Sequence, residues 1–413
     1  MISTNYHFFK NKEINIVVFL FLFSFFLRMP VVLLFGDQGL ENEWEGLVYN
    51  LIVHGKLALD LDGLLLPNLY MPPLYAYYLY FFSFFGLGDQ NYILLILLSQ
   101  SLLASISVAV FYKINKLFFS QKISFYSSLL LSLFPVYVFA CSQISSISLQ
   151  IFLSILFFYF FFQLVKKKNI LSIVLLSFTG GLLILLRGEF WAIFALSLLY
   201  LFLFFKIPIK KISLIFLITL ITISPYLIRN VLIFKKITVL ESFGYNLWKG
   251  NHPAAMENSF VEGSEIMNEN LMEKLNAIPK DKFWRINFDK MYLEEAITNI
   301  MKEPTGHLIF FFKKTISFLF VSNKSHDPRY SNPLHYLPLL ILGITSLIGI
   351  ILSDKKSYQL NYLIFIFFLN IIIFSTVSIM PRYKLIILPL QIIFTNVLVE
   401  RIREKFFYQR KNN

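Results

Sequence analysis

The chain has 413 residues, of which 57% are hydrophobic and only 15% are charged, and 48 of them are phenylalanine. Soluble domains carry about a quarter charged residues, so this composition excludes an ordinary soluble protein. The net charge of +13 does not indicate nucleic-acid binding, because the cations form short clusters between apolar runs, as in the cytoplasmic loops of membrane proteins. The single cysteine, Cys141, excludes an intramolecular disulfide.

Apolar runs of the length that crosses a bilayer, about 20 residues, recur along the whole chain. The first run has Lys10 and Lys12 before it and no small-residue cleavage site after it, so we expect a retained span and not a signal peptide. We predict ten transmembrane spans, near residues 15–35, 92–112, 123–141, 147–165, 170–186, 190–205, 212–229, 335–353, 360–379 and 385–400.

Clusters of lysine and arginine predict the orientation, because such clusters mark cytoplasmic loops. They follow the second, fourth, sixth, eighth and tenth predicted spans. We therefore expect both termini in the cytoplasm and an all-α, polytopic protein of the inner (cytoplasmic) membrane. The clusters are Lys113, Lys116 and Lys122; Lys166, Lys167 and Lys168; Lys206, Lys210 and Lys211; Lys355 and Lys356; and Arg401, Arg403, Lys405, Arg410 and Lys411.

This topology divides the chain into three parts. Residues 1–229 form a transmembrane module that includes an acidic first outer loop, 36–91. Residues 230–334 are the most polar stretch and are expected to form a small helical segment outside the membrane. Residues 335–413 contain the last spans and a basic cytoplasmic tail.

One apolar run in the outer segment, Leu308–Val321, is short for a span and carries Lys313 and Lys314 at its middle. Charges at that depth in hydrocarbon are costly. We therefore expect a helix along the membrane surface.

The first outer loop is expected to contain two surface helices. Asn42 and Glu45 form a capping box and Gly55 ends the first helix. Leu74–Phe85 is aromatic-rich and too short for a comfortable span, so it is the second. In the first helix, the helical period places Glu43, Asn50 and His54 on a polar face. The opposite, apolar stripe suits the membrane surface and contains Trp44, Leu47, Val48, Leu51 and Ile52.

Four segments, in this order and at the outer ends of predicted spans, resemble motifs of one family. They are Glu43 and Trp44 with Val48–Leu51 and Gly55; Met71–Tyr75; Pro225–Asn230 followed by Gly244–Asn251; and Pro381–Lys384 with Pro389.

On these segments the chain resembles the membrane-embedded glycosyltransferases of the GT-C fold, in the bacterial branch related to protein O-mannosyltransferases and lipid A aminoarabinose transferases. The resemblance covers most of the chain, although residues 255–303 contribute little. It implies a GT-C-like fold of about ten transmembrane helices with surface helices in the outer loops.

The resemblance also implies a reaction. Such enzymes transfer a sugar from a polyprenyl-phosphate carrier to an acceptor hydroxyl, typically with inversion, and a carboxylate takes the acceptor proton. Glu43 matches the acidic position of the family best. Because the family often has aspartate there, frequently in an acidic pair, Glu41 and Asp37 stay open as alternatives.

The presence of cations near the outer ends of spans requires an explanation, because the positive-inside rule disfavours them there. A leaving lipid phosphate supplies one, since its negative charge grows as the bond breaks. Ordinary headgroup contacts or ion pairs, such as Arg187 with Glu189, are the alternative. The expected substrate contacts are Arg382, Arg229, Lys384 and Arg187, with Asn50, His54 and Tyr75 from the first outer loop.

One region departs from the family pattern. Relatives commonly have an acid at the outer end of the third and fourth spans, where this chain has Ser142–Ser146. A second carboxylate, if the reaction needs one, must then come from the first loop. His252 and His326 are isolated, so we expect no tightly bound metal or other cofactor, which leaves open a weak need for a divalent cation. The sequence contains neither a P-loop nor a Rossmann fingerprint, which argues against direct use of a nucleotide.

We therefore expect a cell-envelope glycosyltransferase whose active site faces the periplasm or exterior. Its partners would be the lipid-linked donor, membrane lipids and an acceptor on lipid A, a protein or a surface glycan. An O-antigen ligase or polymerase would use arginine and histidine of a late outer loop, and a flippase would place charges within its spans. Here the acids concentrate in the first outer loop, which favours the transferase.

Overall fold

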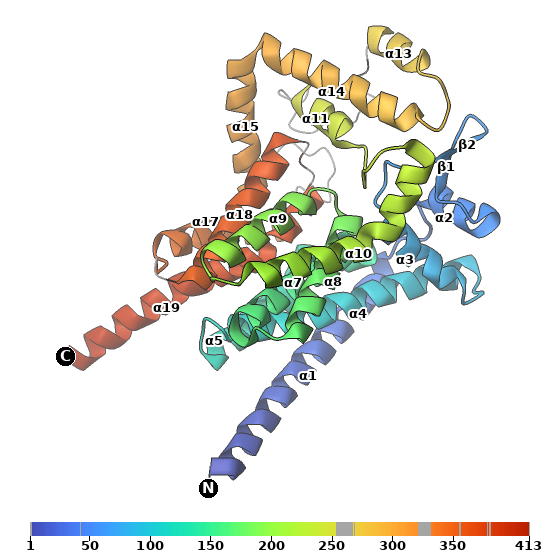
Figure 1. The fold of residues 1–413 in the computed structure, drawn as a ribbon. Helices are drawn as coiled ribbons and strands as arrows, with labels where there is room; N and C mark the ends of the chain where they lie inside the picture. Colours follow the sequence, from blue (N-terminus) through green and yellow to red (C-terminus); the bar gives the residue numbers. More distant parts are fainter. Residues whose placement is uncertain are drawn as a thin grey trace.

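The computed structural model describes residues 2–41, 43–252, 267, 269–320, 332–354, 357–377, 379 and 381–412. Long helices form a bundle, and a smaller group of helices lies across one end of it (Figure 1). The two chain ends lie at the opposite end of the bundle from that group, on one side of the molecule (Figure 1).

Each predicted span coincides with a helix or a bent pair of helices. Six helices are long and apolar enough to cross a membrane, or seven if the pair α5–α6 counts as one span, and α8 and α9 are shorter apolar helices. The chain is thus a multi-pass membrane protein, while the count of ten spans stays a prediction. The bundle contains α1 (Ile2–Phe35), α4 (Asp89–Asn115), α5 (Gln121–Leu133), α6 (Pro135–Phe139), α7 (Ile147–Lys167), α8 (Ile170–Leu186), α9 (Phe190–Leu203), α10 (Ile209–Phe234), α17 (Pro333–Ile351), α18 (Tyr358–Thr376) and α19 (Leu388–Asn412).

The third predicted span is bent by 55° between α5 and α6. Pro135 has no N–H and cannot continue the ladder of α5, so carbonyls at the end of that helix lose their partners. Arg28 of α1 is fully buried there and donates from Nη1 to the carbonyl oxygen of Ser132, 3.3 Å away. Its guanidinium also lies 4.9 Å from the ring centre of Tyr137. A buried cation therefore accompanies the bend.

The first outer loop contains a hairpin that the sequence analysis did not predict. Helix α2 (Glu43–His54) ends at Gly55, whose φ of +62° confirms the predicted end of the helix. Strands β1 (Ala58–Leu61) and β2 (Leu64–Pro67) then pair antiparallel. Asp62 and Gly63 form the two-residue turn, and both have positive φ, as a type I′ turn requires.

The hairpin changes which face of α2 is buried. Asn50, expected on a polar face, is only 4% exposed and donates from Nδ2 to the carbonyl oxygen of Ala58, 3.0 Å away. Ile52, expected in the apolar stripe, is 54% exposed. The predicted apolar stripe is buried at Leu47, Val48 and Leu51, but the predicted polar face was wrong at Asn50, because β1 packs against the helix from that side. The second expected surface helix is α3 (Pro73–Ser83).

The outer segment is helical, as predicted, and has a core of its own. Trp248 and Tyr292 pack at its centre with their rings 4.5 Å apart, together with Leu247, Leu271 and Phe310. Its described helices are α11 (Phe243–Asn251), α13 (Glu269–Asn276), α14 (Trp284–Lys302) and α15 (Pro304–Leu319).

The two lysines in the middle of α15 differ in their surroundings. Lys313 is exposed, but Lys314 is only 4% exposed. The Lys314 ammonium donates to oxygens at the end of α11, on Gly250 (2.9 Å) and Asn251 (3.1 Å), and to the carbonyl of Val377 just after α18 (3.2 Å). Carbonyls at helix C-termini lack intrahelical partners and carry partial negative charge, which explains why a buried cation is tolerated.

Burial of Lys314 makes the stability of this joint depend on pH. Burial lowers the pKa of the Lys314 ammonium to about 7, and that of Lys384 likewise. The unfolded chain, with a lysine pKa of about 10.4, therefore holds more protons than the folded chain between pH 7 and 10. The free energy of unfolding should rise with pH in that window, by up to about 1 kcal/mol per pH unit for each lysine.

We expect Lys314→Met to reduce this pH slope, measured by chemical unfolding of the protein in detergent between pH 6 and 10. The exposed neighbour gives the matched control, because Lys313→Met should leave the slope as in the wild type. Equal slopes in the wild type and in Lys314→Met would contradict the assignment.

Candidate functional site

The three candidate acids of the first outer loop lie in different surroundings. Glu43 is half-buried at the first residue of α2, and its carboxylate makes no hydrogen bond or ion pair with any described residue. Glu41 is exposed. Asp37 is half-buried, and its Oδ2 accepts a hydrogen bond from the backbone N–H of Ile144 at 2.6 Å. Asp37 thus brings a carboxylate to the Ser142–Ser146 loop, which has none of its own.

Tyr70 lies where the first outer loop meets the outer segment. Its ring centre is 3.9 Å from the guanidinium carbon of Arg285. Burial raises the pKa of the Tyr70 phenol above its ordinary value, the charge of Arg285 lowers it, and Tyr245, Glu43 and Tyr383 raise it further. Glu43 and Tyr383 are therefore near enough to Tyr70 for their negative charge to act on its phenol.

Arg285, in the first turn of α14, was missed by the sequence analysis. It is only 9% exposed, lies 4.4 Å from the ring centre of Phe288 and donates from Nε to the carbonyl of Glu241 at 3.0 Å. Its Nη2 is buried without a hydrogen-bond partner in the described part of the chain. The aromatic neighbours Trp284 and Phe288 in the sequence were the available signal, because guanidinium groups stack on such rings.

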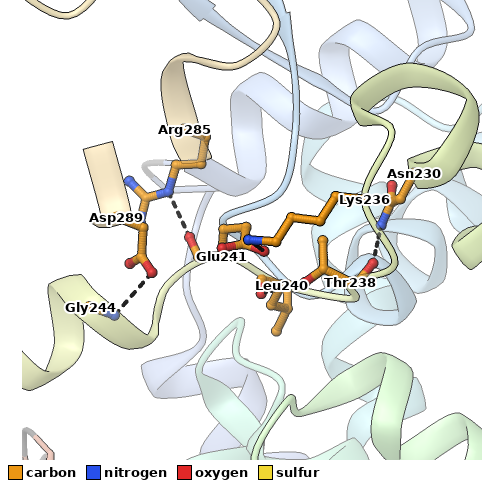
Figure 2. Close-up of polar contacts among 8 residues, drawn as sticks. All are labelled: Asn230, Lys236, Thr238, Leu240, Glu241, Gly244, Arg285 and Asp289. Carbon is orange, nitrogen blue, oxygen red and sulfur yellow. Dashed lines mark hydrogen bonds and ion pairs between the residues drawn. The ribbon is translucent and has the colours of Figure 1, made fainter. Parts of the chain in front are cut away.

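The connection from α10 to α11 contacts α14 and the first outer loop, and Figure 2 shows its contact with Arg285 of α14. The Glu241 carboxylate pairs with Lys236 at 2.7 Å, its carbonyl accepts from Arg285, and its N–H donates to the carbonyl of Leu69 at 2.8 Å. Nδ2 of Asn230 donates to the carbonyl of Thr238, further along the same connection (Figure 2). These contacts place Arg285 beside Tyr70.

Gly244 allows α11 to approach α14 closely. The Asp289 carboxylate accepts hydrogen bonds from the backbone N–H groups of Gly244 and Tyr245, both at 3.0 Å (Figure 2). A Cβ atom at residue 244 would lie 2.0 Å from the backbone oxygen of Asp289. The glycine of this motif is therefore explained by packing.

Arg187 and Glu189 lie between α8 and α9 and line a cavity of about 20 Å³. Nε of Arg187 donates to Oε1 of Gln150 at 2.8 Å and lies 3.9 Å from Oε1 of Glu189. Neither terminal nitrogen of Arg187 makes a hydrogen bond to a described residue, and the guanidinium carbon lies 5.1 Å from the ring centre of Tyr383. The Nε–H of Arg187 is thus used within the protein, whereas its terminal nitrogens have donors available for a ligand.

The Pro381–Lys384 motif forms a 3-10 helix, η3 (Pro381–Ile386), before α19. Arg382 is exposed, lies 5.9 Å from the ring centre of Tyr383 and makes no hydrogen bond to a described residue. Lys384 is buried and donates to the carbonyl of Phe320 at 3.1 Å. Tyr383 therefore brings Arg187 and Arg382 together, whereas Lys384 points into the protein.

Three further predicted site residues either make hydrogen bonds within the protein or lie away from Glu43. Arg229 donates to the carbonyls of Leu57 (2.9 Å) and Asn68 (3.0 Å), and so fixes the two ends of the hairpin to α10. Tyr75 is fully buried and donates to Oε1 of Gln100 at 2.9 Å. His54 is exposed at the last residue of α2, about three helical turns from Glu43.

No group of three or more histidine, cysteine, aspartate or glutamate side chains suited to a metal ion occurs among the residues that the structure describes. His252 lies near Trp248, with ring centres 5.6 Å apart, and His326 lies outside the described residues. The expectation of no tightly bound metal stays a prediction.

No family model and no curated protein matches the sequence. Solved structures do match. The archaeal oligosaccharyltransferase AglB from Archaeoglobus fulgidus, in complex with an inhibitory peptide and a dolichol-phosphate, superposes with a TM-score of 0.57 at 13% identity, over 98% of this chain and 52% of that one. The same enzyme tethered to an acceptor peptide gives 0.58 at 13% identity, over 98% and 51%.

ArnT from Cupriavidus metallidurans gives a TM-score of 0.36 at 12% identity, over 96% of this chain and 77% of that one, which is too low to establish a common fold. The chain spans about half the length of the oligosaccharyltransferase structures that it matches. Those structures confirm the predicted GT-C fold of an all-α membrane protein.

Gly244→Ala should weaken the docking of α11 on α14, because the added methyl group meets the Asp289 carbonyl. Overpacking of this kind costs about 1–3 kcal/mol. We expect a lower midpoint of thermal unfolding and faster tryptic cleavage within the outer segment. Gly88→Ala is the control, since nothing lies within 4 Å of its Cβ position. Equal cleavage rates in both variants would contradict the packing explanation.

Proposed function

We propose that this protein transfers a sugar from a polyprenyl-phosphate carrier to an acceptor hydroxyl on the outer face of the cytoplasmic membrane. The observation that supports this most is the half-buried Glu43 carboxylate, which makes no hydrogen bond or ion pair with a described residue. The charges of Glu43 and Tyr383 both act on the phenol of Tyr70. The ring of Tyr383 in turn lies near the guanidinium groups of Arg187 and Arg382. The fold adds support, because an oligosaccharyltransferase of the same fold has been solved with a dolichol-phosphate.

In the proposed reaction, Glu43 accepts the proton of the acceptor hydroxyl while the hydroxyl oxygen attacks the anomeric carbon. The bond from the anomeric carbon to the phosphate oxygen breaks, and its electron pair leaves with the lipid phosphate. Attack opposite the leaving group inverts the anomeric centre. A positioned general base contributes about 10²- to 10⁴-fold to the rate of such a step.

Glu43 is favoured over the other two acids by its contacts. Glu41 is exposed, so water surrounds it and competes with a substrate. The Asp37 carboxylate already accepts the Ile144 N–H, and its backbone N–H donates to the Ser142 carbonyl at 2.9 Å, which gives it a structural role. A base must have an oxygen free for the acceptor proton, and Glu43 meets that requirement.

Arg187 and Arg382 are favoured as phosphate contacts by the same test. Arg229 and Lys384 donate to backbone carbonyls inside the protein. The terminal nitrogens of Arg187 and the guanidinium of Arg382 have no such partners among the described residues. Their planar donor groups match phosphate oxygens, and they would stabilise the charge that grows on the leaving group.

The proposed orientation has support from the arrangement of the chain. The basic clusters follow every second predicted span, and the two chain ends lie away from the helices of the outer segment (Figure 1). Glu43 and Arg382 then face the periplasm or exterior. The acceptor belongs to a lipid, a protein or a surface glycan, and a peptide acceptor is bound in one oligosaccharyltransferase structure of this fold.

Glu43→Gln should strongly slow the reaction without loss of folded protein, because the amide is nearly isosteric and cannot take the proton. Glycolipids and glycoproteins of a deletion strain, profiled by mass spectrometry, should regain the missing sugar with the wild type and with Glu45→Gln, an exposed acid two residues away. With Glu43→Gln we expect transfer about 10²- to 10⁴-fold lower. Undiminished transfer by Glu43→Gln would remove Glu43 as the base.

Arg187→Met and Arg382→Met should each weaken the binding of nonaprenyl phosphate to the purified protein by about 10- to 100-fold, the range for lost hydrogen bonds to a charged group. Binding can be measured by calorimetry in lipid nanodiscs. Lys290→Met, which removes an exposed cation of α14, is the control for net charge. If all three variants bound nonaprenyl phosphate equally, the phosphate site would have to lie elsewhere.

A further inference from the structure

We propose that the small cavity between α7, α9 and α18 binds a hydroxyl group of the transferred sugar, and that Glu189 selects that hydroxyl. The inference rests on the proposed function and adds the class of donor: a sugar with a free hydroxyl that reaches this cavity. From the sequence alone, Glu189 is expected only as an ion-pair partner of Arg187.

The size of the cavity limits what enters it. A volume of about 20 Å³ holds one water-sized group. A whole sugar ring or a phosphate does not fit. Polar walls come from Gln150 and Ser154 of α7, Arg187 and Glu189 before α9, and Asn370 of α18. Apolar residues, among them Phe158 and Ile366, close the rest.

One buried carboxylate oxygen in the walls lacks a donor, although Gln150 and Ser154 also bring donor groups to the cavity. Oε1 of Glu189 is buried and has no hydrogen-bond partner in the described part of the chain. Arg187 does not supply one, because its Nε lies 3.9 Å away and donates to Gln150 instead. Nδ2 of Asn370 donates to the carbonyl of Ile366 in its own helix at 2.8 Å, so its Oδ1 is the amide atom left to accept. A buried carboxylate oxygen without a donor costs free energy that a hydroxyl would recover.

Charge decides which donor fits. An anionic group would be repelled by the Glu189 carboxylate, so the phosphate belongs on the terminal nitrogens of Arg187 and not in the cavity. An ammonium group would lie against the Arg187 guanidinium, whose Nε is only 3.9 Å from the same carboxylate oxygen. A neutral hydroxyl meets neither repulsion. It also supplies the missing donor.

The cavity lies beside the proposed phosphate contact. Arg187 takes part in both, with Nε held by Gln150 at the cavity wall and its terminal nitrogens free of described partners. The ring of Tyr383 lies next to the same guanidinium. One sugar ring separates the anomeric phosphate of a donor from its other hydroxyls. A donor whose phosphate contacts Arg187 would therefore reach the cavity with a hydroxyl.

The test compares synthetic nonaprenyl-phosphate sugars with their monodeoxy analogues. A panel of mannose, glucose and arabinose donors is titrated against the wild type and against Glu189→Leu in nanodiscs. For the wild type, removal of one particular hydroxyl should weaken binding of its preferred donor about 10- to 100-fold. In Glu189→Leu the hydroxylated donor should lose that advantage, so that it and its deoxy analogue bind with similar affinity.

Two controls separate this role from folding and from phosphate binding. Sugar-free nonaprenyl phosphate should bind Glu189→Leu at least as tightly as it binds the wild type, because a nearby negative charge is removed. Glu189→Gln, which keeps an acceptor oxygen, should retain part of the discrimination even if the leucine variant folds poorly.

The outcomes that overturn the proposal are distinct. If the wild type discriminates against a deoxy sugar and Glu189→Leu and Glu189→Gln discriminate equally well, the cavity holds only water and the inference fails alone. If the wild type binds no nonaprenyl-phosphate sugar, the proposed function fails and the inference with it.

Discussion

A buried ammonium at the ends of two helices joins the outer segment to the membrane bundle. Lys314 donates to oxygens at the end of α11 and just after α18. Those carbonyls lie at the negative ends of the helix dipoles and lack intrahelical partners, so they would be costly to bury without a donor. Because one cation contacts both ends, the outer segment cannot leave the bundle without exposing them. Arg285 belongs to α14, which leads directly into α15, and its hydrogen bond to the Glu241 carbonyl holds it beside Tyr70.

The cations of this protein differ in whether their N–H groups are already used. Arg28, Arg229 and Lys384 donate to backbone carbonyls within the protein, so they stabilise a helix bend, the hairpin and the end of α15. Arg187 and Arg382 keep donors without described partners and share the ring of Tyr383. The positive-inside rule identifies all the outer cations as unusual, but it cannot separate these two groups. The hydrogen bonds in the structure do separate the two groups of cations.

The sequence predicted the helices well and the site only in part. Apolar runs are long-range signals of a span, so each predicted span coincides with a helix or a bent pair. The hairpin was missed although Asp62 and Gly63 form a typical turn pair, because four-residue strands carry little pattern. Because the hairpin was not predicted, the burial of Asn50 against it was not predicted either. Arg285 was missed although the aromatic residues Trp284 and Phe288 stand near it in the sequence. The Glu189 cavity could not be predicted, since α7 and α18 meet α9 only in the tertiary fold.

The distribution of carboxylates gives the departure at Ser142–Ser146 a physical explanation. That loop has no acid of its own, but Asp37 supplies one through the hydrogen bond from the Ile144 N–H. The carboxylate is thereby fixed and serves the structure. Glu43 and Glu189 instead stand at the starts of α2 and α9, where the helix dipole favours negative charge without occupying a carboxylate oxygen. The proposed reaction would use these two acids on separate helices, Glu43 for the attacking hydroxyl and Glu189 for a hydroxyl of the sugar.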